Sequence, residues 1–317
     1  MSLISFLLLI GSLIGIAVIL SAFARNTWIG TLAVQFAPFY GILLLLIFIS
    51  YLALGTYEYL FSSGLLLGLS LFEVLSRIRW NRPAAADTIE GKDSLKIFLA
   101  NVNADNKNVQ TLVNSITESR SELVILLEVS PEMNSLLEKA CSDDWEHCSY
   151  HIYRGEKFGL KVMSSFRLSD VVCNSDQEAP AAPQFLGSLY LPLTSLRLVI
   201  LHPLSPERRS WMPLRRKGIV RGGEIAREAR EKGEQVILLG DLNATPWDPL
   251  FGDLLRISGL RDARRGFGYI GTWPTLLPPA MIPLDHVLVS EGITVRQFRR
   301  GKRVGSDHWP VEVDLKL

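Results

Sequence analysis

Two long stretches near the start of the sequence contain no charged residue, and they constrain the fold more than any other feature. Leu3 to Phe23 and Thr31 to Leu54 are each long enough as a helix to cross a hydrocarbon core of about 30 Å. A third apolar stretch, Tyr59 to Ile78, has only 14 uncharged residues between Glu58 and Glu73. We therefore predict transmembrane spans over 3–23, 31–54 and 59–78, of which the third has the weakest pattern.

The first stretch has one alternative interpretation, a cleaved signal peptide. Ala22-Phe23-Ala24 has the small-x-small form of a cleavage site. However, no Lys or Arg precedes the apolar run, and further apolar segments follow it. These features favour an uncleaved anchor, and we expect a multi-pass protein of the cell (inner) membrane that contacts lipid through its N-terminal helices.

The arginines beside the spans predict the orientation. With three spans, Arg25 lies on the same side of the membrane as Arg77, Arg79 and Arg82, while the opposite side carries only Glu58. The positive-inside bias then places the C-terminal region in the cytoplasm. With two spans Arg25 lies opposite the other three arginines, and the excess of three over one still favours the cytoplasm.

The composition changes after Trp80. Residues 81–94 are small, polar and proline-containing, which is typical of a linker. We therefore divide the chain into a transmembrane region, 1–80, a linker, 81–94, and one large domain, 95–317. The three cysteines form an odd count with no disulfide spacing, so the fold does not require disulfides.

Short apolar runs alternate with amphipathic stretches in the domain. The sequence predicts strands over 95–102, 122–129, 196–204 and 235–242, and helices over 109–120 and 218–233, the latter closed by Gly233. Thr245, Pro246 and Asp248 have the pattern of a further helix start. Such alternation indicates an α/β or layered α+β domain.

Polar side chains follow the apolar runs at several predicted strand ends. A single polar residue at a strand end is ordinary, but here the pattern recurs six times. If the strands are neighbours, their ends bring several carboxylates to one rim, and that charge is costly unless a cation lies among them. Hard oxygen ligands favour Mg²⁺, with Mn²⁺ also possible. The residues are Asn101, Glu128, His202, Asp241, Asp285 and the pair Asp307 and His308.

The ordered motifs resemble one known family. The segments "ANVNADN", "VILLEVS", "VILHPLSP", "ILLGDLNATPWDP", "PLDHVLVS" and "VGSDHWPV" are similar to those of the endonuclease/exonuclease/phosphatase superfamily, which includes the deoxyribonuclease I-like nucleases. The resemblance covers nearly all of 95–317 and implies a four-layer α/β sandwich, two packed mixed β-sheets flanked by helices. The N-terminal spans resemble those of membrane-anchored bacterial members.

The resemblance also implies a role for each residue. Glu128 would be the main metal ligand, with Asn101 and Asp307 nearby. Asp241 would orient or deprotonate the attacking water, and Asn243 would hold that water and a phosphate oxygen. His308 would bind the scissile phosphate, Asp285 would fix its ring, and His202 would contact phosphate or serve the leaving group. His286, adjacent to Asp285 in a strand, should face the other way and be structural.

The substrate class stays open at the level of sequence. The net charge of +1 favours no particular polyanion, although two basic clusters, 208–217 and 296–303, could face phosphates or solvent. We expect a metal-dependent hydrolase of a phosphodiester or phosphomonoester, acting on nucleic acid or on a phospholipid or inositol-phosphate substrate. The alternative is a catalytically silent, membrane-tethered module that binds phosphorylated ligands. No protein partner can be inferred.

Overall fold

The computed structural model describes residues 2–23, 26–76, 94–141, 145–154, 158–174 and 183–317. Arg25, Arg77, Arg79 and Arg82 lie outside the described residues, as does nearly all of the predicted linker. The chain divides into two compact units. The first comprises 1–79 with 206–212 and 244–252, and the second comprises 80–205, 213–243 and 253–317.

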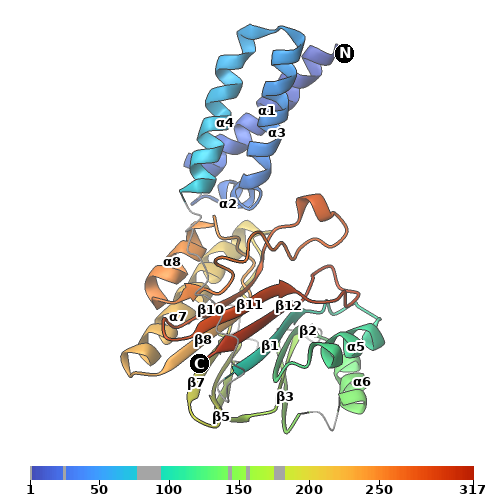
Figure 1. Cartoon of the computed structure of the whole chain (residues 1–317), viewed down its shortest axis with the longest axis vertical. Helices are drawn as coiled ribbons and strands as arrows, with labels where there is room; N and C mark the ends of the chain where they lie inside the picture. The colour runs from blue at the N-terminus through green and yellow to red at the C-terminus, as the bar shows by residue number, and fades with distance from the viewer. Residues whose placement is uncertain (1, 24–25, 77–93, 142–144, 155–157, 175–182) are drawn as a thin grey trace. The chain divides into compact units, whose positions relative to one another are not determined.

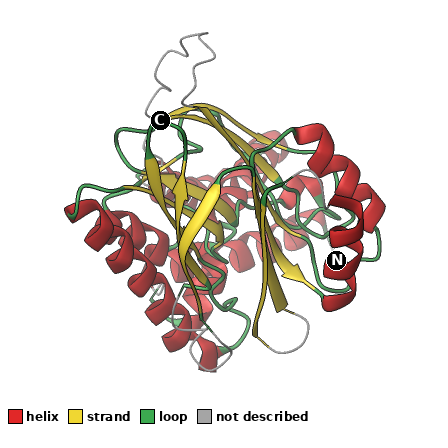
Figure 2. Ribbon diagram, turned by 90° about the horizontal axis from the view of Figure 1, so that it is seen from below, coloured by secondary structure: helices red, strands yellow, loops and turns green. Residues whose placement is uncertain are grey.

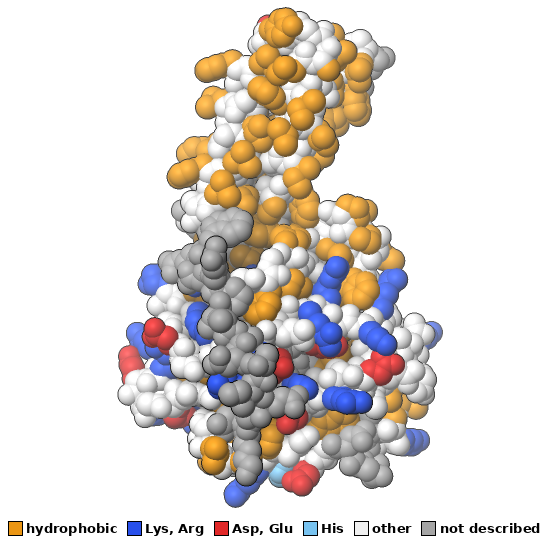
Figure 3. Space-filling view, viewed as in Figure 1, with side chains coloured by type: hydrophobic (Ala, Val, Ile, Leu, Met, Phe, Trp, Pro, Cys, Tyr) orange, Lys and Arg blue, Asp and Glu red, His pale blue; other side chains and the backbone are white. Residues whose placement is uncertain are grey.

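The first unit contains the N-terminal helices α1 (Leu3–Phe23), α2 (Trp28–Val34), α3 (Ala37–Leu54) and α4 (Leu60–Leu75), with a short 3₁₀ turn, Tyr57–Tyr59, before α4. Three of its segments, Leu3–Phe23, Ala37–Leu54 and Tyr57–Leu75, are long and apolar enough to cross a membrane. Hydrophobic side chains cover the visible face of these helices (Figure 3). Such helices are typical of an apolar solvent rather than of water.

The helices pack on one another through a small apolar core that includes Val18, Leu44 and Tyr51. Glu73, the acid inside the third segment, is buried and accepts a 2.5 Å hydrogen bond from Ser21 Oγ of α1. A polar side chain inside such a segment normally faces the bundle interior and finds a partner there. This contact explains how the third segment carries a carboxylate.

The second predicted span differs from the structure, because 31–54 is not one helix. Helix α2 ends at Val34 and α3 begins at Ala37, with Pro38 in its first turn. Proline lacks the N–H that would bond four residues back and its ring clashes with the carbonyl there, which is that of Val34. The helix therefore breaks at Gln35 and Phe36.

The second unit contains two six-stranded sheets (Figure 1). The first has the order β11-β12-β1-β2-β4-β3 and the second β5-β6-β7-β8-β10-β9. The bounds of the first sheet are β1 Ser94–Asn101, β2 Leu123–Val129, β3 His147–Arg154, β4 Phe158–Ser164, β11 Thr294–Arg300 and β12 Val311–Lys316. Those of the second are β5 Arg167–Cys173, β6 Phe185–Tyr190, β7 Ser195–Ile200, β8 Gln235–Asp241, β9 Arg261–Asp262 and β10 Asp285–Val289.

Each sheet is mixed, because it contains one parallel pair among antiparallel neighbours. The parallel pairs are β1 with β2 and β7 with β8. Helix α5 (Val109–Ser119) connects the first pair and α7 (Met212–Glu231) connects the second. Two β-α-β crossovers therefore occupy the middle of the two sheets, and the carboxyl ends of the strands in each pair lie at one edge.

Strand alternation builds the core. Ile97 and Leu99 of β1 pack between the sheets with Ile237 and Leu239 of β8. Phe98 and Ala100 of β1 instead pack against residues of α5 and α6 (Pro131–Cys141). Figure 2 shows the strands between helices on both sides. The predicted sandwich of two packed mixed sheets with flanking helices is confirmed.

The predicted helix start at Thr245 is wrong. Residues 245–248 form a turn closed by the Asp248 N–H on the Thr245 carbonyl, and helix α8 is Pro249–Ser258. The Asp248 carboxylate accepts a 2.9 Å hydrogen bond from Leu250 N and so caps α8. Asp248 provides the capping oxygen that the sequence pattern assigned to Thr245.

Candidate active site

Four of the predicted residues meet at the carboxyl ends of the two parallel strand pairs, β1 with β2 and β7 with β8. Asn101 is the last residue of β1, and its Nδ2 lies 2.9 Å from Glu128 Oε1 and 3.1 Å from Asp241 Oδ2. His202 Nε2 lies 3.5 Å from the same Glu128 oxygen and 3.7 Å from the same Asp241 oxygen. Asn101 and Glu128 belong to strands of one sheet, whereas Asp241 ends a strand of the other and His202 follows one, so the site contains residues from both sides of the sandwich.

Asp285 and His308 complete this group from the other side of Asp241. His308 Nδ1 lies 2.9 Å from Asp285 Oδ2, and its Nε2 lies 3.7 Å from Asp241 Oδ2. The Ser306 hydroxyl accepts from His308 N at 3.0 Å and donates to the Asn101 carbonyl at 2.8 Å, which fixes the loop that carries the histidine. All three members of the Asp241, Asp285 and His308 group are buried.

The structure corrects how Asp285 reaches the rim. The sequence indicated an apolar run that ends at Asp285, but this residue is the first of β10. Since β10 runs antiparallel to β8, its start pairs in register with the end of β8, and Asp285 lies opposite Asp241. An antiparallel neighbour brings its first residue to the edge where parallel strands bring their last.

Asp307 is held beside this group by two donors. Its Oδ1 accepts from Asn103 Nδ2 at 2.9 Å and its Oδ2 accepts from Trp273 Nε1 at 3.0 Å. Burial tends to raise the pKa of Asp307, but the His308 charge and these hydrogen bonds outweigh that effect and lower it. Asp307 is therefore an ionised carboxylate at neutral pH.

Asn243 lies on the turn that follows β8. Its N–H donates to Asp241 Oδ1 at 2.9 Å, and its Nδ2 donates to the Pro203 carbonyl at 3.0 Å. Arg215 Nη2 donates to the Asn243 carbonyl at 2.9 Å. The turn thus connects the ends of β7 and β8 and holds one oxygen of Asp241 while the other faces the histidines.

Three rim residues, Asn103, Glu128 and Asn243, have positive φ angles of 60°, 58° and 49°. Glu128 also lies at a bulge, where the β2–β4 register shifts between Leu127 and Val129. A regular strand would place Leu127 and Val129 on one face, yet they belong to the inter-sheet core and the helix-facing core respectively. The bulge turns the Glu128 carboxylate onto the rim, and such backbone strain commonly occurs at functional sites.

In the buried group of Asp241, Asp285 and His308, burial and neighbouring charges shift the pKa values of Asp241 and His308. Burial raises the pKa of Asp241 to about 7, with His308 acting against this rise and Asp285 adding to it. Burial alone would lower the pKa of His308, but the carboxylates of Asp285 and Asp241 outweigh it and raise that pKa to about 10. His308 is therefore cationic at neutral pH, and a bound cation at the rim would favour the charged form of Asp241.

Two sets of residues could hold a metal ion. Asp241, Asp285 and His308 offer ligand atoms within 4.8 Å of one another. However, His308 Nδ1 and Asp285 Oδ2 already bond each other, which occupies one ligand atom of each residue. Glu128, whose side chain is 20% exposed, offers hard oxygens at the rim. Asn101 lies beside it, with Nδ2 toward Glu128 and with Oδ1 accepting a 3.1 Å hydrogen bond from Asn103 N. We therefore favour the Glu128 side as the metal site.

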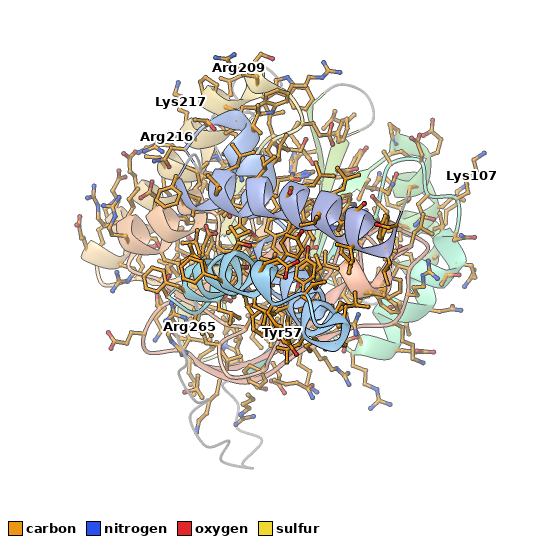
Figure 4. All side chains as sticks on the ribbon, turned by 90° about the horizontal axis from the view of Figure 1, so that it is seen from above. Tyr57, Lys107, Arg209, Arg216, Lys217 and Arg265 are labelled. Atoms are coloured by element: carbon orange, nitrogen blue, oxygen red, sulfur yellow. The ribbon has the colours of Figure 1, made fainter. Side chains whose placement is uncertain are left out.

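Sequence reasoning missed several residues that brace the site. Tyr153 OH lies 2.5 Å from His202 Nδ1, and the Gln184 side chain accepts the His202 N–H. Neither residue follows an apolar run at a strand end, so the sequence carried no signal for them. Arg215 belongs to the basic cluster 208–217 of the sequence, but it is fully buried, whereas its neighbours Arg216 and Lys217 are exposed (Figure 4).

Comparison with known proteins extends these observations. The model of the Endonuclease/Exonuclease/phosphatase family matches residues 98–308. A search of the curated proteins found no match.

Solved structures share the fold. TDP2 from Caenorhabditis elegans superposes with a TM-score of 0.57 at 16% identity, covering 82% of this chain and 84% of that one. D. rerio TDP2 in complex with a single-strand DNA product gives 0.54 at 15%, covering 71% and 99%. An endonuclease/exonuclease/phosphatase from Beutenbergia cavernae gives 0.55 at 17%, covering 71% and 72%.

Proposed function

Because the chain belongs to the endonuclease/exonuclease/phosphatase family, we propose that it is a membrane-anchored hydrolase that cleaves a phosphodiester or phosphomonoester with the help of a divalent metal ion. One observation carries the proposal. A single oxygen of Asp241 lies 3.7 Å from both His202 Nε2 and His308 Nε2, and 3.1 Å from the amide of Asn101. A carboxylate base between two imidazoles suits in-line attack of water on a phosphate ester.

Each residue would have a distinct part in that reaction. Asp241, whose pKa is raised toward neutrality, would orient the attacking water and accept its proton. His308, kept cationic by Asp285, would donate hydrogen bonds to the phosphoryl oxygens as their negative charge grows. His202 would contact a phosphate oxygen or serve the leaving group, and Asn243 would hold the water through its remaining amide atoms.

The rim residues fit a hard divalent ion. The buried Asp285 Oδ1 has no hydrogen-bond partner among the described residues, and burial disfavours the charge of Asp241, so a nearby cation would stabilise both carboxylates. Glu128 and Asn101 would hold Mg²⁺, or Mn²⁺, with Asp307 close by as the third predicted ligand. When bound, the ion would withdraw electron density from the phosphoryl group.

The substrate is proposed at the level of a phosphate ester. Nucleic acid is one candidate, because a relative of the same fold is described in complex with a single-strand DNA product. A phospholipid or inositol phosphate is the other, because the three apolar N-terminal helices would hold the enzyme at a lipid surface.

The direct test uses the full-length protein in detergent with bis(p-nitrophenyl) phosphate as a generic phosphodiester. We expect nitrophenolate release that needs Mg²⁺ or Mn²⁺ and stops with EDTA. Asp241→Asn should lower kcat by about 10²- to 10⁴-fold, the usual contribution of a general base. Asp170→Asn, the same change at an exposed position of β5, is the matched control.

Two results would overturn the proposal. One is unchanged turnover in Asp241→Asn. The other is the absence of metal-dependent hydrolysis of this probe, plasmid, single-stranded DNA, inositol phosphates and sphingomyelin alike, which would favour a silent binding module.

A further inference from the structure

The break between α2 and α3 brings a buried glutamine against a loop of distant sequence. Gln35 follows α2, and residues 244–252 belong to the same compact unit as the N-terminal helices. That loop begins one residue after Asn243, on the turn that carries Asp241. The contacts of Gln35 therefore concern the segment that continues directly from the candidate active site.

Gln35 uses its side chain and its carbonyl on this loop. Oε1 accepts a 2.9 Å hydrogen bond from Thr245 N, and Nε2 donates to Asp248 Oδ2 at 2.8 Å. Nε2 also donates to the Thr31 carbonyl at 3.1 Å, and the Gln35 carbonyl accepts from Trp247 Nε1 at 2.8 Å. Gln35, Thr245 and Asp248 are all buried, with exposures of 4%, 0% and 1%.

These contacts are specific to an amide. The loop presents one N–H, which needs an acceptor, and one carboxylate, which needs a donor, and a glutamine side chain offers both from adjacent atoms. A buried group that loses such a partner bears the full cost of desolvation. The neutral side chain thus satisfies a buried carboxylate and a backbone amide together.

The loop transmits this constraint to the active site over a very short distance. Only Ala244 separates Thr245 from Asn243, and successive Cα atoms are about 3.8 Å apart. Strand β8 fixes the turn on its upstream side, and Gln35 fixes it on the downstream side. Asn243, with its positive φ, lies between these two anchors and holds Asp241 Oδ1 through its own N–H.

A second tie supports this arrangement. Trp28 Nε1 at the start of α2 donates to the Pro206 carbonyl at 2.8 Å, and Pro206 follows His202 by four residues. The segments that continue from β7 and from β8 are thus both bonded within the unit that contains the N-terminal helices.

We propose that Gln35 is a positioning residue, which holds the Thr245–Asp248 turn and thereby sets the orientation of Asn243 and Asp241 for catalysis. The proposal rests on the proposed function. It makes a residue just before a helix that is apolar enough to cross a membrane part of the support of the catalytic turn.

The test compares full-length variants in detergent, with bis(p-nitrophenyl) phosphate and Mg²⁺ as the probe. In Gln35→Ala we expect kcat to fall by up to about 10²-fold with KM little changed, since misplacement by about 1 Å has that effect. Gln110→Ala, the same change at an exposed position of α5, should keep the kcat of the wild type.

Two substitutions that exchange the amide of Gln35 and the carboxylate of Asp248 distinguish a positioning role from a general loss of stability. Gln35→Glu places a second carboxylate against Asp248 and should lower kcat. Adding Asp248→Asn gives that carboxylate an amide donor, while the side-chain oxygen that remains at position 248 can still cap Leu250 N. The double variant should therefore recover part of the lost kcat. Failure of the double variant to exceed Gln35→Glu would contradict the specific contact.

Amide hydrogen exchange provides a readout that does not depend on turnover. In Gln35→Ala, exchange at Leu242, Asn243 and Thr245 should become faster, while exchange in β1 stays unchanged. Unchanged exchange at Asn243 would overturn the proposal, as would faster exchange with an unaltered kcat. The wild type could fail to hydrolyse any substrate while Gln35→Ala still speeds exchange at Asn243. In that case the contact of Gln35 with the Thr245–Asp248 turn is supported and the proposed function is contradicted.

Discussion

The carboxylate of Asp285 has one clear task, which is to hold and charge His308. Its Oδ2 lies 2.9 Å from the ring, and the pair is buried in the sandwich. A neutral amide at this position could still accept the Nδ1 hydrogen bond but would not stabilise a cation. Asp285 thus contributes most, ahead of Asp241, to the positive charge of His308, the imidazole proposed to bind phosphate.

We expect Asp285→Asn to lower kcat for bis(p-nitrophenyl) phosphate by about 10²-fold or more, the lower end of the range for assisted proton transfer and orientation. Steady-state kinetics of the detergent-solubilised protein measure this loss. Asp314→Asn, at a partly exposed position of β12, is the control for the same change away from the site. A loss of less than about threefold, far below the range for such a role, would remove Asp285 from the proposed mechanism.

Asp262 is a residue whose charge stabilises the fold away from the site. Its carboxylate is buried and lies 2.6 Å from Arg264 Nη2. Burial tends to raise the pKa of Asp262, but Arg264 and His286 outweigh that effect and lower it. His286 thus contributes to this pair on the side of β10 opposite to the active site, consistent with the expectation that it is structural.

The lowered pKa gives a signed prediction for stability. A carboxyl with a lower pKa in the folded state adds stability above its unfolded pKa of about 3.9, and that stability is lost as the pH falls below this value. Asp262→Asn should lower the free energy of unfolding by about 3 kcal/mol at pH 7, because Arg264 loses its buried partner. The same change at Asp253, a partly exposed residue that pairs with the exposed Arg256, should cost less than about 1 kcal/mol.

Urea denaturation of both variants between pH 7 and pH 3 measures this effect. The deficit of Asp262→Asn relative to the wild type should shrink as the medium becomes acidic. A deficit that is constant with pH would show that the charge of Asp262 is not its source.

At the scale of elements, Gly240 sets the distance between β8, which carries Asp241, and the segment after β7, which carries His202. Its φ is +144°, and a Cβ built on it would lie 1.9 Å from the Leu201 carbonyl oxygen. The contact is between two backbones, so no rotation of a side chain can relieve it. The close approach of β8 to the segment after β7 therefore requires glycine.

We expect Gly240→Ala to destabilise the domain by more than about 3 kcal/mol, because it combines backbone strain with overpacking. Gly252→Ala is the matched control, since nothing lies within 4 Å of its Cβ position on α8 and alanine favours a helix. Thermal unfolding distinguishes them, with Tm lowered for the first and unchanged or raised for the second. Equal Tm values would contradict the close approach.

The elements that the sequence predicted well are those whose local signal agrees with the fold. The apolar runs of β1, β2, β7 and β8 and the amphipathic pattern of α5 indicated both type and position. The pattern of α7 indicated its type, but the helix begins at Met212, six residues before the predicted start at 218. The parallel pairing of these strands then explains why Asn101, Glu128, His202 and Asp241 converge. Their convergence follows from the crossovers, which a run of strand and helix signals can indicate.

The remaining features depend on contacts between distant parts of the chain. Tyr153 reaches His202 only because β3 and β7 belong to different sheets packed face to face. Asp285 reaches the rim because β10 is antiparallel, and no local pattern states the direction of a strand. Thr245 lost its expected capping role because Asp248 caps α8. The break at Gln35 had a local signal in Pro38, which the uncharged composition of the span obscured.

At the scale of the whole molecule, replacement of the arginines beside the predicted spans tests on which side of the membrane the C-terminal domain lies. A reporter that is active only in the cytoplasm, fused after Leu317, should be active in the wild-type protein. Replacing Arg77, Arg79 and Arg82 with glutamine should reduce this activity, while the same change at Arg227, Arg230 and Arg256 should not. A second reporter, active only outside the cytoplasm, should be inactive when fused to the wild-type protein. Activity of this second reporter would contradict the predicted orientation.

The pairing of β12 with β1 has a consequence for biosynthesis. In this pair Ser94 lies opposite Lys316. The first strand of the domain, β1, therefore pairs with β12, which is synthesised after all the other strands. During translation β1 leaves the ribosome early, yet one of its sides lacks a neighbour until residues 311–316 emerge. For that interval a nascent chain exposes the backbone edge of a central strand, which is open to pairing with other chains. Closure of this sheet is therefore a late event in the maturation of the protein.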